Sequence, residues 1–437
     1  MKKYSFHLIL FAFLMICKTG FTQESLTIDE AVDTALKQNY SLRVANNEVS
    51  TAEVDTKSLN SGFLPRITIG SGVNYANEDQ SVTFADGNST AVSNAITESY
   101  NASITAEYTI FDGFERKFTN RRNKQYLSLK QLEEKQQIEN TIVNIYESYY
   151  QIAFQKQVVE NLKYTIRNSQ DRLDRARRKV KYGQGTQLDI LTAKVDLGND
   201  SITYRSSLTD LTNLKRNLNF LMGRDPLTSF TIDTLLVFQP QMNKDSLLML
   251  MKSKNTQLMI AEQNLTLAKT DILINRAKLL PKINGSGSYQ WSQSDNPPTS
   301  FALSNEIYGV NLGINLSWSL FDGGKTKTAV KKAKITSENR SINYEELEEQ
   351  LKVDLYNAYE TYLNEIYKFQ TEESNVEVNR LNFQRTQKQY GLGQITTVEF
   401  RQAQINLFNA LNNYAQAKYN VKLAEVNLLL LSGTLVD

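Results

Sequence analysis

The sequence repeats one ordered set of punctuating residues, and this internal duplication limits the fold more than any other feature. The recurring anchors are Asn39 with Asn255, Leu64–Ile67 with Leu280–Ile283, Ile110–Gly113 with Leu320–Gly323, Tyr182–Gly185 with Tyr390–Gly393, and Leu221–Gly223 with Leu431–Gly433. Their spacing runs from 208 (390 − 182) to 216 (255 − 39) residues. We therefore predict two structural repeats, residues 23–223 and 245–437, joined by a linker at 224–244 that contains two prolines.

Each predicted repeat carries two segments in which apolar and polar residues alternate. The alternation is clearest at about 99–111 and 307–321, and their partners at about 66–77 and 282–292 alternate more weakly. A period of two over roughly 11 residues is the pattern of a strand that crosses an outer membrane. A half-buried soluble sheet would alternate too. The aromatic residues near both segment ends, which include Trp291 and Trp318, favour membrane strands.

Two long segments without glycine or proline follow the strand pairs, at 114–182 and 325–390. At a rise of ~1.5 Å per residue, each predicts a helix about 100 Å long. Apolar residues recur in steps of three and four, as in the run Ile138, Ile142, Ile145, Tyr149 and Ile152. This spacing predicts a coiled-coil seam, while the polar residues on the other faces predict wetted helices.

Shorter helices are predicted to return along the long ones. The return helices at 187–222 and 396–431 are about half as long, and helices of similar length are predicted at 28–61 and 245–280. Stacked end to end, one of each would match a long helix. The predicted fold is mostly α, with helix-strand-strand-helix repeats and a smaller β portion.

The N-terminus has the basic, apolar and small-residue order of a signal peptide, predicted at 1–22. Lipidation at Cys17 is the alternative, although Ile16 is bulky where a lipidation signal has a small residue. His7 is the only histidine and Cys17 the only cysteine, so the mature chain would contain neither. That composition excludes Ser-His-Asp and Cys-His catalysis, Cys/His metal sites and disulfides. No paired acids suggest a carboxylate-based hydrolase, so we predict no enzyme and no cofactor.

The charge balance excludes another class of partner. Lys and Arg total 49 and Asp and Glu total 47, so no global field attracts nucleic acid. Local basic clusters do follow each Phe-Asp-Gly motif, namely Arg116, Lys117, Arg121, Arg122 and Lys124, and Lys325, Lys327, Lys331, Lys332 and Lys334. They are interpreted either as solvated helix faces or as contacts to anionic groups at the membrane surface.

Four strands cannot close a barrel, because the smallest membrane barrels have about eight and an open edge in lipid leaves backbone groups unpaired. The chain must therefore oligomerise. The duplicated units, the Leu-Pro-(Arg/Lys)-Ile and Phe-Asp-Gly signatures and the Tyr-Gly-x-Gly turns together resemble TolC-type outer-membrane efflux proteins. The resemblance covers essentially the whole mature chain.

The resemblance implies a homotrimer with a 12-strand barrel in outer-membrane lipid of a Gram-negative bacterium, and an α-barrel that projects into the periplasm. It also implies docking to a periplasmic adaptor and an inner-membrane pump of RND or ABC type. The adaptor-contact tip would comprise Tyr182, Gly183, Gly185, Tyr390, Gly391 and Gly393. Asp189 and Glu399 would belong to an entrance gate, although both also suit the first turn of a helix. The competing function is a barrel-anchored adhesive coiled coil without transport.

Overall fold

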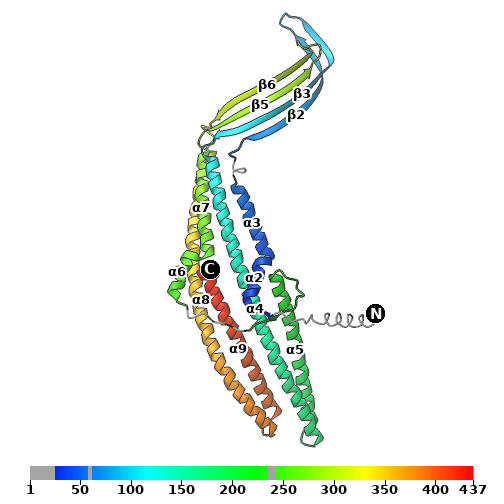
Figure 1. Cartoon of the computed structure of the whole chain (residues 1–437), viewed down its shortest axis with the longest axis vertical. Helices are drawn as coiled ribbons and strands as arrows, with labels where there is room; N and C mark the ends of the chain where they lie inside the picture. Colours follow the sequence, from blue (N-terminus) through cyan, green and yellow to red (C-terminus); the bar gives the residue numbers. More distant parts are fainter. Residues whose placement is uncertain (1–24, 58–61, 235, 237, 239–241, 437) are drawn as a thin grey trace, which may run out of the picture. The chain divides into compact units, whose positions relative to one another are not determined.

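The computed structural model describes residues 25–57, 62–234, 236, 238 and 242–436, and its elements follow the same order in both halves of the chain (Figure 1). Strands β2 and β3 precede helices α4 and α5, and strands β5 and β6 precede helices α8 and α9. The chain forms two compact units. We call residues 47–133 and 259–347 the sheet unit, and the remaining described residues the helical unit. The predicted signal peptide lies outside the described residues.

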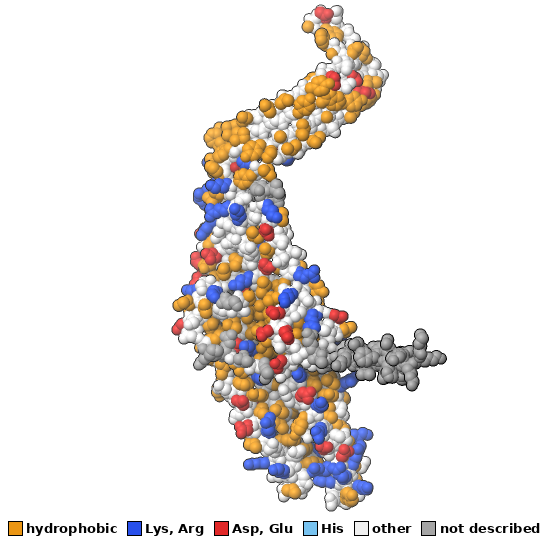
Figure 2. All heavy atoms as spheres, in the orientation of Figure 1, with side chains coloured by type: hydrophobic (Ala, Val, Ile, Leu, Met, Phe, Trp, Pro, Cys, Tyr) orange, Lys and Arg blue, Asp and Glu red, His pale blue; other side chains and the backbone are white. Residues whose placement is uncertain are grey.

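The sheet unit contains one antiparallel sheet in the order β2-β3-β5-β6. Its strands are β2 (Arg66–Thr83), β3 (Ser89–Phe111), β5 (Lys282–Asp295) and β6 (Ser304–Ser317). Among the described residues, β2 pairs only with β3 and β6 pairs only with β5. One face of β6 presents Val310, Leu312 and Ile314, which are 66%, 84% and 78% exposed. Figure 2 shows hydrophobic side chains spread along these strands.

The first two strands are longer than the alternating segments that predicted them. The hairpin continues through polar residues to Thr83 and Ser89, beyond a bulge at Glu78 and Gln80. Its turn is made by Asp86, whose carboxylate accepts the Asn88 backbone N–H at 3.0 Å, and by Gly87 at φ +87°. Backbone pairing, rather than side-chain alternation, therefore sets the length of this hairpin.

The last strand ends earlier than predicted. Strand β6 stops at Ser317, which is opposite Lys282, the first residue of β5. Pro281 precedes Lys282 and has no N–H to extend the ladder. Beyond the strand, the Trp318 indole N–H donates to the Leu279 carbonyl at 3.1 Å instead.

The helical unit is built on two long helices and their shorter neighbours. Helices α4 (Glu115–Lys181) and α8 (Lys325–Gly391) each have 67 residues and extend into both units. The returning helices are α5 (Gln187–Leu221) and α9 (Thr397–Ser432), and the short helices of this unit are α2 (Ile28–Gln38) and α6 (Lys244–Lys254). Most residues of α3 (Tyr40–Thr56) and α7 (Thr256–Ala277) belong to the sheet unit. A short parallel ladder joins β1 (Ser25–Leu26) to β4 (Thr231–Ile232).

The main core of the helical unit surrounds the middle of α4. Ile145, Tyr149 and Ile152 are almost fully buried there, together with Leu218 and Met222. The first three lie on the seam predicted from their spacing in steps of three and four. The Tyr149 hydroxyl lies 2.9 Å from the carbonyl oxygens of both Leu26 and Asp233, so the strands of the short ladder are fixed to the long helix.

Each predicted shorter helix is broken by an asparagine where a returning helix ends. Asn39 separates α2 from α3, and its amide N–H donates to the Leu221 carbonyl at 2.7 Å while its side-chain oxygen accepts the Ser41 N–H. In the second half, Asn255 donates to the Leu431 carbonyl at 3.0 Å and accepts the Leu258 N–H. Each asparagine thus caps the start of one helix and the end of another. The helices predicted at 28–61 and 245–280 are therefore not continuous, because each consists of two helices, α2 and α3 or α6 and α7.

Loss of an asparagine joint should destabilise the fold. Asn255→Ala removes a buried donor and a helix cap, and we expect it to lower the free energy of unfolding by about 1–3 kcal/mol. The midpoint of chemical denaturation, followed by circular dichroism, measures this effect. Asn47→Ala on the exposed surface of α3 is the control and should change stability by less than about 0.5 kcal/mol. Equal midpoints for the two variants would contradict the joint.

Candidate functional site: the hairpin tips

The first tip joins α4 to α5 through residues 182–186. Gly183 adopts φ +71°, and its N–H donates to the Val180 carbonyl while the Gln184 N–H donates to the Lys179 carbonyl. This is the Schellman arrangement, in which a left-handed glycine closes the end of a helix. Tyr182 is 72% exposed beside it.

The second tip joins α8 to α9 through residues 392–396 and repeats the same geometry. Gly393 adopts φ +74°, and the N–H groups of Gly393 and Gln394 donate to the carbonyls of Tyr390 and Gln389. Leu392, which is 74% exposed, occupies the position that Tyr182 has in the first tip.

The two tips align at a spacing of 210 residues (393 − 183), so the predicted spacing of 208 was wrong there. Of the four tip glycines, Gly183 and Gly393 are left-handed, whereas Gly185 and Gly391 are not. Gly185 is limited by packing instead, because a Cβ atom there would lie 3.1 Å from Lys179 Cβ. Gly391 is the last residue of α8. Matching the two Tyr-Gly-x-Gly motifs therefore gave the wrong alignment of the tips. Each long helix is closed by its left-handed glycine, and this glycine is the first of the motif in one tip and the second in the other.

Tyr390 consequently lies on the helix and is only 6% exposed. Its ring stacks on Phe400 with centroids 4.7 Å apart, inside a cluster with Phe383. The cationic groups of Arg175 and Lys179 from α4 lie 5.4 and 5.5 Å from the Tyr390 ring centroid. Tyr390 is therefore part of the contact between the two hairpins and is not an exposed tip residue like Tyr182.

The two predicted gate acids have the same local role in both tips. Thr186 and Asp189 form a capping box at the start of α5, and Thr396 and Glu399 form another at the start of α9. Hydrogen bonds from the backbone N–H and the hydroxyl of the threonine hold the pKa of each carboxyl group below its usual range. The caps are therefore intact at neutral pH and weaken as the pH falls through these lowered values. The role of Asp189 and Glu399 in a gate stays a prediction.

A polar cluster that the sequence did not reveal joins the hairpins farther from the tips. Arg401 of α9 makes two bonds to the Asp200 carboxylate of α5, at 2.6 and 2.9 Å. The Ser169 hydroxyl of α4 donates to the same carboxylate at 2.6 Å. Nearby, the almost fully buried Arg172 pairs with Asp196. Because Asp200 and Arg401 are 201 residues apart, no local pattern could have indicated their pairing.

Two other features are absent from the described part of the chain. No three His, Cys, Asp or Glu side chains there are grouped so that they could hold a metal ion. No helix in that part combines the length and apolar character needed to cross a membrane. The chemical features of the tips are therefore exposed side chains, left-handed turns and charged contacts between hairpins.

A family model described as outer membrane efflux protein matches residues 31–224 and 247–434. The chain belongs to this family, which confirms the predicted transport role and outer-membrane location.

Individual relatives agree over nearly the full length. The outer membrane protein TolC of Vibrio cholerae is 22% identical over 402 residues, which are 91% of this chain and 88% of TolC. The proteases secretion protein PrtF of Dickeya chrysanthemi is 18% identical over 430 residues, covering 97% and 91% of the two chains. The crystal structure of the CmeC outer membrane channel of Campylobacter jejuni has the same fold, with a TM-score of 0.79 at 15% identity and coverage of 93% and 86%.

Proposed function

We propose that three copies of this chain form one exit duct for efflux or type I secretion, without catalysis. The observation that carries the proposal is the sheet. Among the described residues β2 and β6 each have one unpaired edge, and β6 exposes a row of apolar side chains. In lipid such edges must be paired, and pairing β6 of one copy with β2 of the next would close a 12-strand barrel. The names of TolC and PrtF support an outer-membrane and a secretion role.

The adhesive alternative requires hairpins that pack into a solid bundle. In the helical unit many polar side chains of α4 and α8 are exposed, including Arg167 of α4 and Glu373 and Lys388 of α8. Polar, hydrated helix faces are expected along a duct and are costly inside a solid bundle. We therefore favour transport. Each family match covers one of the predicted repeats, so we also propose that the chain arose from two copies of one unit.

We further propose that a periplasmic adaptor docks at the tips and that an inner-membrane pump of RND or ABC type supplies the substrate. The exposed residues available for docking are Tyr182, Gly183, Leu392 and Gly393. Gly391 is exposed beside them, whereas the burial of Tyr390 argues for an internal role. Both tips are small and tightly turned, which permits close approach of another helical hairpin.

The tip proposal is tested by enlarging the two left-handed glycines. An added Cβ atom would meet nothing within 4 Å at Gly183 or Gly393, so the cost of substitution is backbone strain of about 1–2 kcal/mol per residue. We expect the double variant Gly183→Leu with Gly393→Leu to reach the outer membrane but to lose adaptor crosslinking. Export should fall at least about tenfold, which corresponds to a loss of ~1.4 kcal/mol in the free energy of docking.

The matched control is Gly87→Leu with Gly323→Leu. Both positions have positive φ and open space, but they lie in the sheet unit. This control carries the same kind of strain and should still dock and export. Normal export by the tip variant, or equal loss in the control, would refute the assignment of the tips.

A further inference from the structure

The first turns of α4 carry more positive charge than their neighbours neutralise. Arg116 pairs with Asp112 at 2.9 Å, and Arg122 pairs with Asp271 at 2.7 Å. The other cations of these turns, Lys117, Arg121 and Lys124, make no ion pair within the described part of the chain. All three are exposed. Acids are therefore placed beside two cations of this cluster and not beside the other three.

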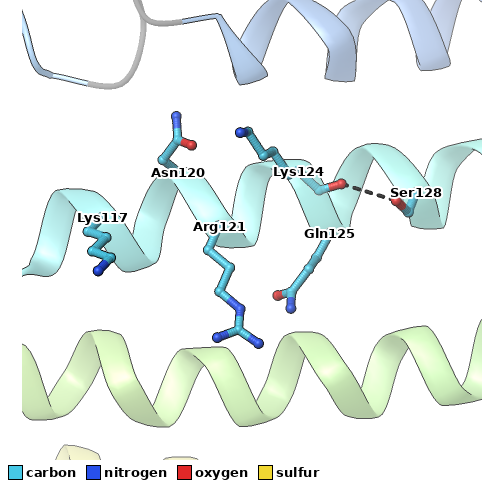
Figure 3. Close-up of a pocket in the computed structure, with 6 residues that line it drawn as sticks. All are labelled: Lys117, Asn120, Arg121, Lys124, Gln125 and Ser128. Carbon is cyan, nitrogen blue, oxygen red and sulfur yellow. Dashed lines mark hydrogen bonds between the residues drawn. The ribbon is translucent and has the colours of Figure 1, made fainter.

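The three unpaired cations line one surface groove of about 410 Å³ with Asn120, Gln125 and Ser128 (Figure 3). Figure 3 shows Asn120 and Lys124 projecting to one side of α4 and Lys117, Arg121 and Gln125 to the other, so nitrogen donors flank the groove. The Gln125 side-chain oxygen already accepts the Thr270 hydroxyl at 2.7 Å, which leaves its NH₂ group as the available donor. None of the described residues that line the groove is acidic.

The second repeat has the cations but not the polar side chains between them. At the spacing of 210 residues, Lys117, Arg121 and Lys124 correspond to Lys327, Lys331 and Lys334. Asn120 and Gln125, however, correspond to Val330 and Ile335, and Ser128 corresponds to an acid, Glu338. A solvated basic face needs only the cations. The additional uncharged donors make the first repeat different and suit an anion with several oxygens.

We propose that this groove on α4 binds a phosphate group, with the phosphate of an anionic lipid headgroup as the expected source. Strand β3 ends at Phe111, and Lys117 to Lys124 follow within about 15 Å along the helix axis, where headgroups border an outer-membrane sheet. Lys and Arg donate charge-assisted bonds to phosphate oxygens, and cations near a membrane surface attract anionic lipid. Figure 2 shows Lys and Arg gathered on the helices beside the strand ends. This inference goes beyond the duct function, and its test does not depend on transport.

The test titrates phosphatidylglycerol into the purified full-length protein in detergent and measures lipid binding by native mass spectrometry. We expect Lys117→Gln, Arg121→Gln and Lys124→Gln together to raise the Kd at least about tenfold, because cations near a lipid surface act additively. Lys327→Gln, Lys331→Gln and Lys334→Gln remove the same charge from the second repeat and should raise it less than about threefold. Equal effects of the two triple variants would overturn the proposal, because they would show only unspecific attraction.

Two further measurements are needed. The first shows whether a lost lipid affinity comes from the groove and not from misfolding, and the second shows whether the ligand is a lipid or a soluble anion. Asn120→Val introduces the residue of the second repeat without changing charge, and it should raise the Kd about threefold through one lost hydrogen bond. An unchanged Kd would overturn the proposal that this groove binds the phosphate group. Inorganic phosphate at millimolar concentration is then added as competitor. Displacement of the lipid that requires Lys117, Arg121 and Lys124 would support the site with a soluble phosphate as its ligand. Resistance of the bound lipid to displacement would support the lipid headgroup as the ligand.

Discussion

Leu312→Arg should nearly abolish the outer-membrane form of the protein. Leu312 is 84% exposed at the centre of β6 and shares its face with Val310 and Ile314. If this face meets lipid, an arginine there costs about 2–4 kcal/mol near the bilayer midplane. In an assembly of three copies the cost is incurred three times. The yield of folded protein in isolated outer membranes, measured by heat-modifiable mobility, should fall at least about tenfold.

The adjacent residue provides the control. Asn311 is also exposed, but successive residues of a strand point to opposite faces, so its side chain would face the lumen. Asn311→Arg introduces the same charge and should retain most of the membrane yield. If both variants inserted equally well, the assignment of the lipid face would be wrong.

Asp200→Ala should loosen the connection between the two hairpins. The substitution leaves Arg401, whose side chain is only 20% exposed, without the carboxylate that accepts its two bonds, and it removes the acceptor of Ser169. Breaking a largely buried pair from one side costs about 3 kcal/mol. We expect a lower denaturation midpoint and, in planar bilayers, a larger or less stable single-channel conductance, because the two hairpins would separate more easily.

Removal of both partners distinguishes the pair from general damage. Asp200→Ala with Arg401→Leu leaves no unpaired charge, and such double replacements are often close to neutral. The double variant should therefore recover most of the lost stability, whereas its conductance should remain altered because the link between hairpins is absent. A double variant less stable than Asp200→Ala would contradict this account.

Much of the fold could be predicted because its signals are local. Long helices at 114–182 and 325–390 were expected from runs without glycine or proline, since those residues interrupt helices. The observed helices α4 and α8 have 67 residues each. The sheet was expected from alternation, which follows from the two faces of a strand. The tip glycines were found as a group, although only Gly183 and Gly393 have the left-handed conformation.

The sequence by itself determined the repeated order of elements, the long helices, the strands with one apolar face and the absence of histidine and cysteine from the chain beyond Cys17. Tertiary structure alone decided the register of the second tip, the burial of Tyr390, the role of Asn39 and Asn255 as joints, and the pairing of Asp200 with Arg401. The helices, the strands and their repeated order depend on backbone geometry, which acts between neighbours in the chain. The second depends on which side chains meet after the hairpins pack, and residues about 200 positions apart leave no periodic pattern that would reveal such a meeting.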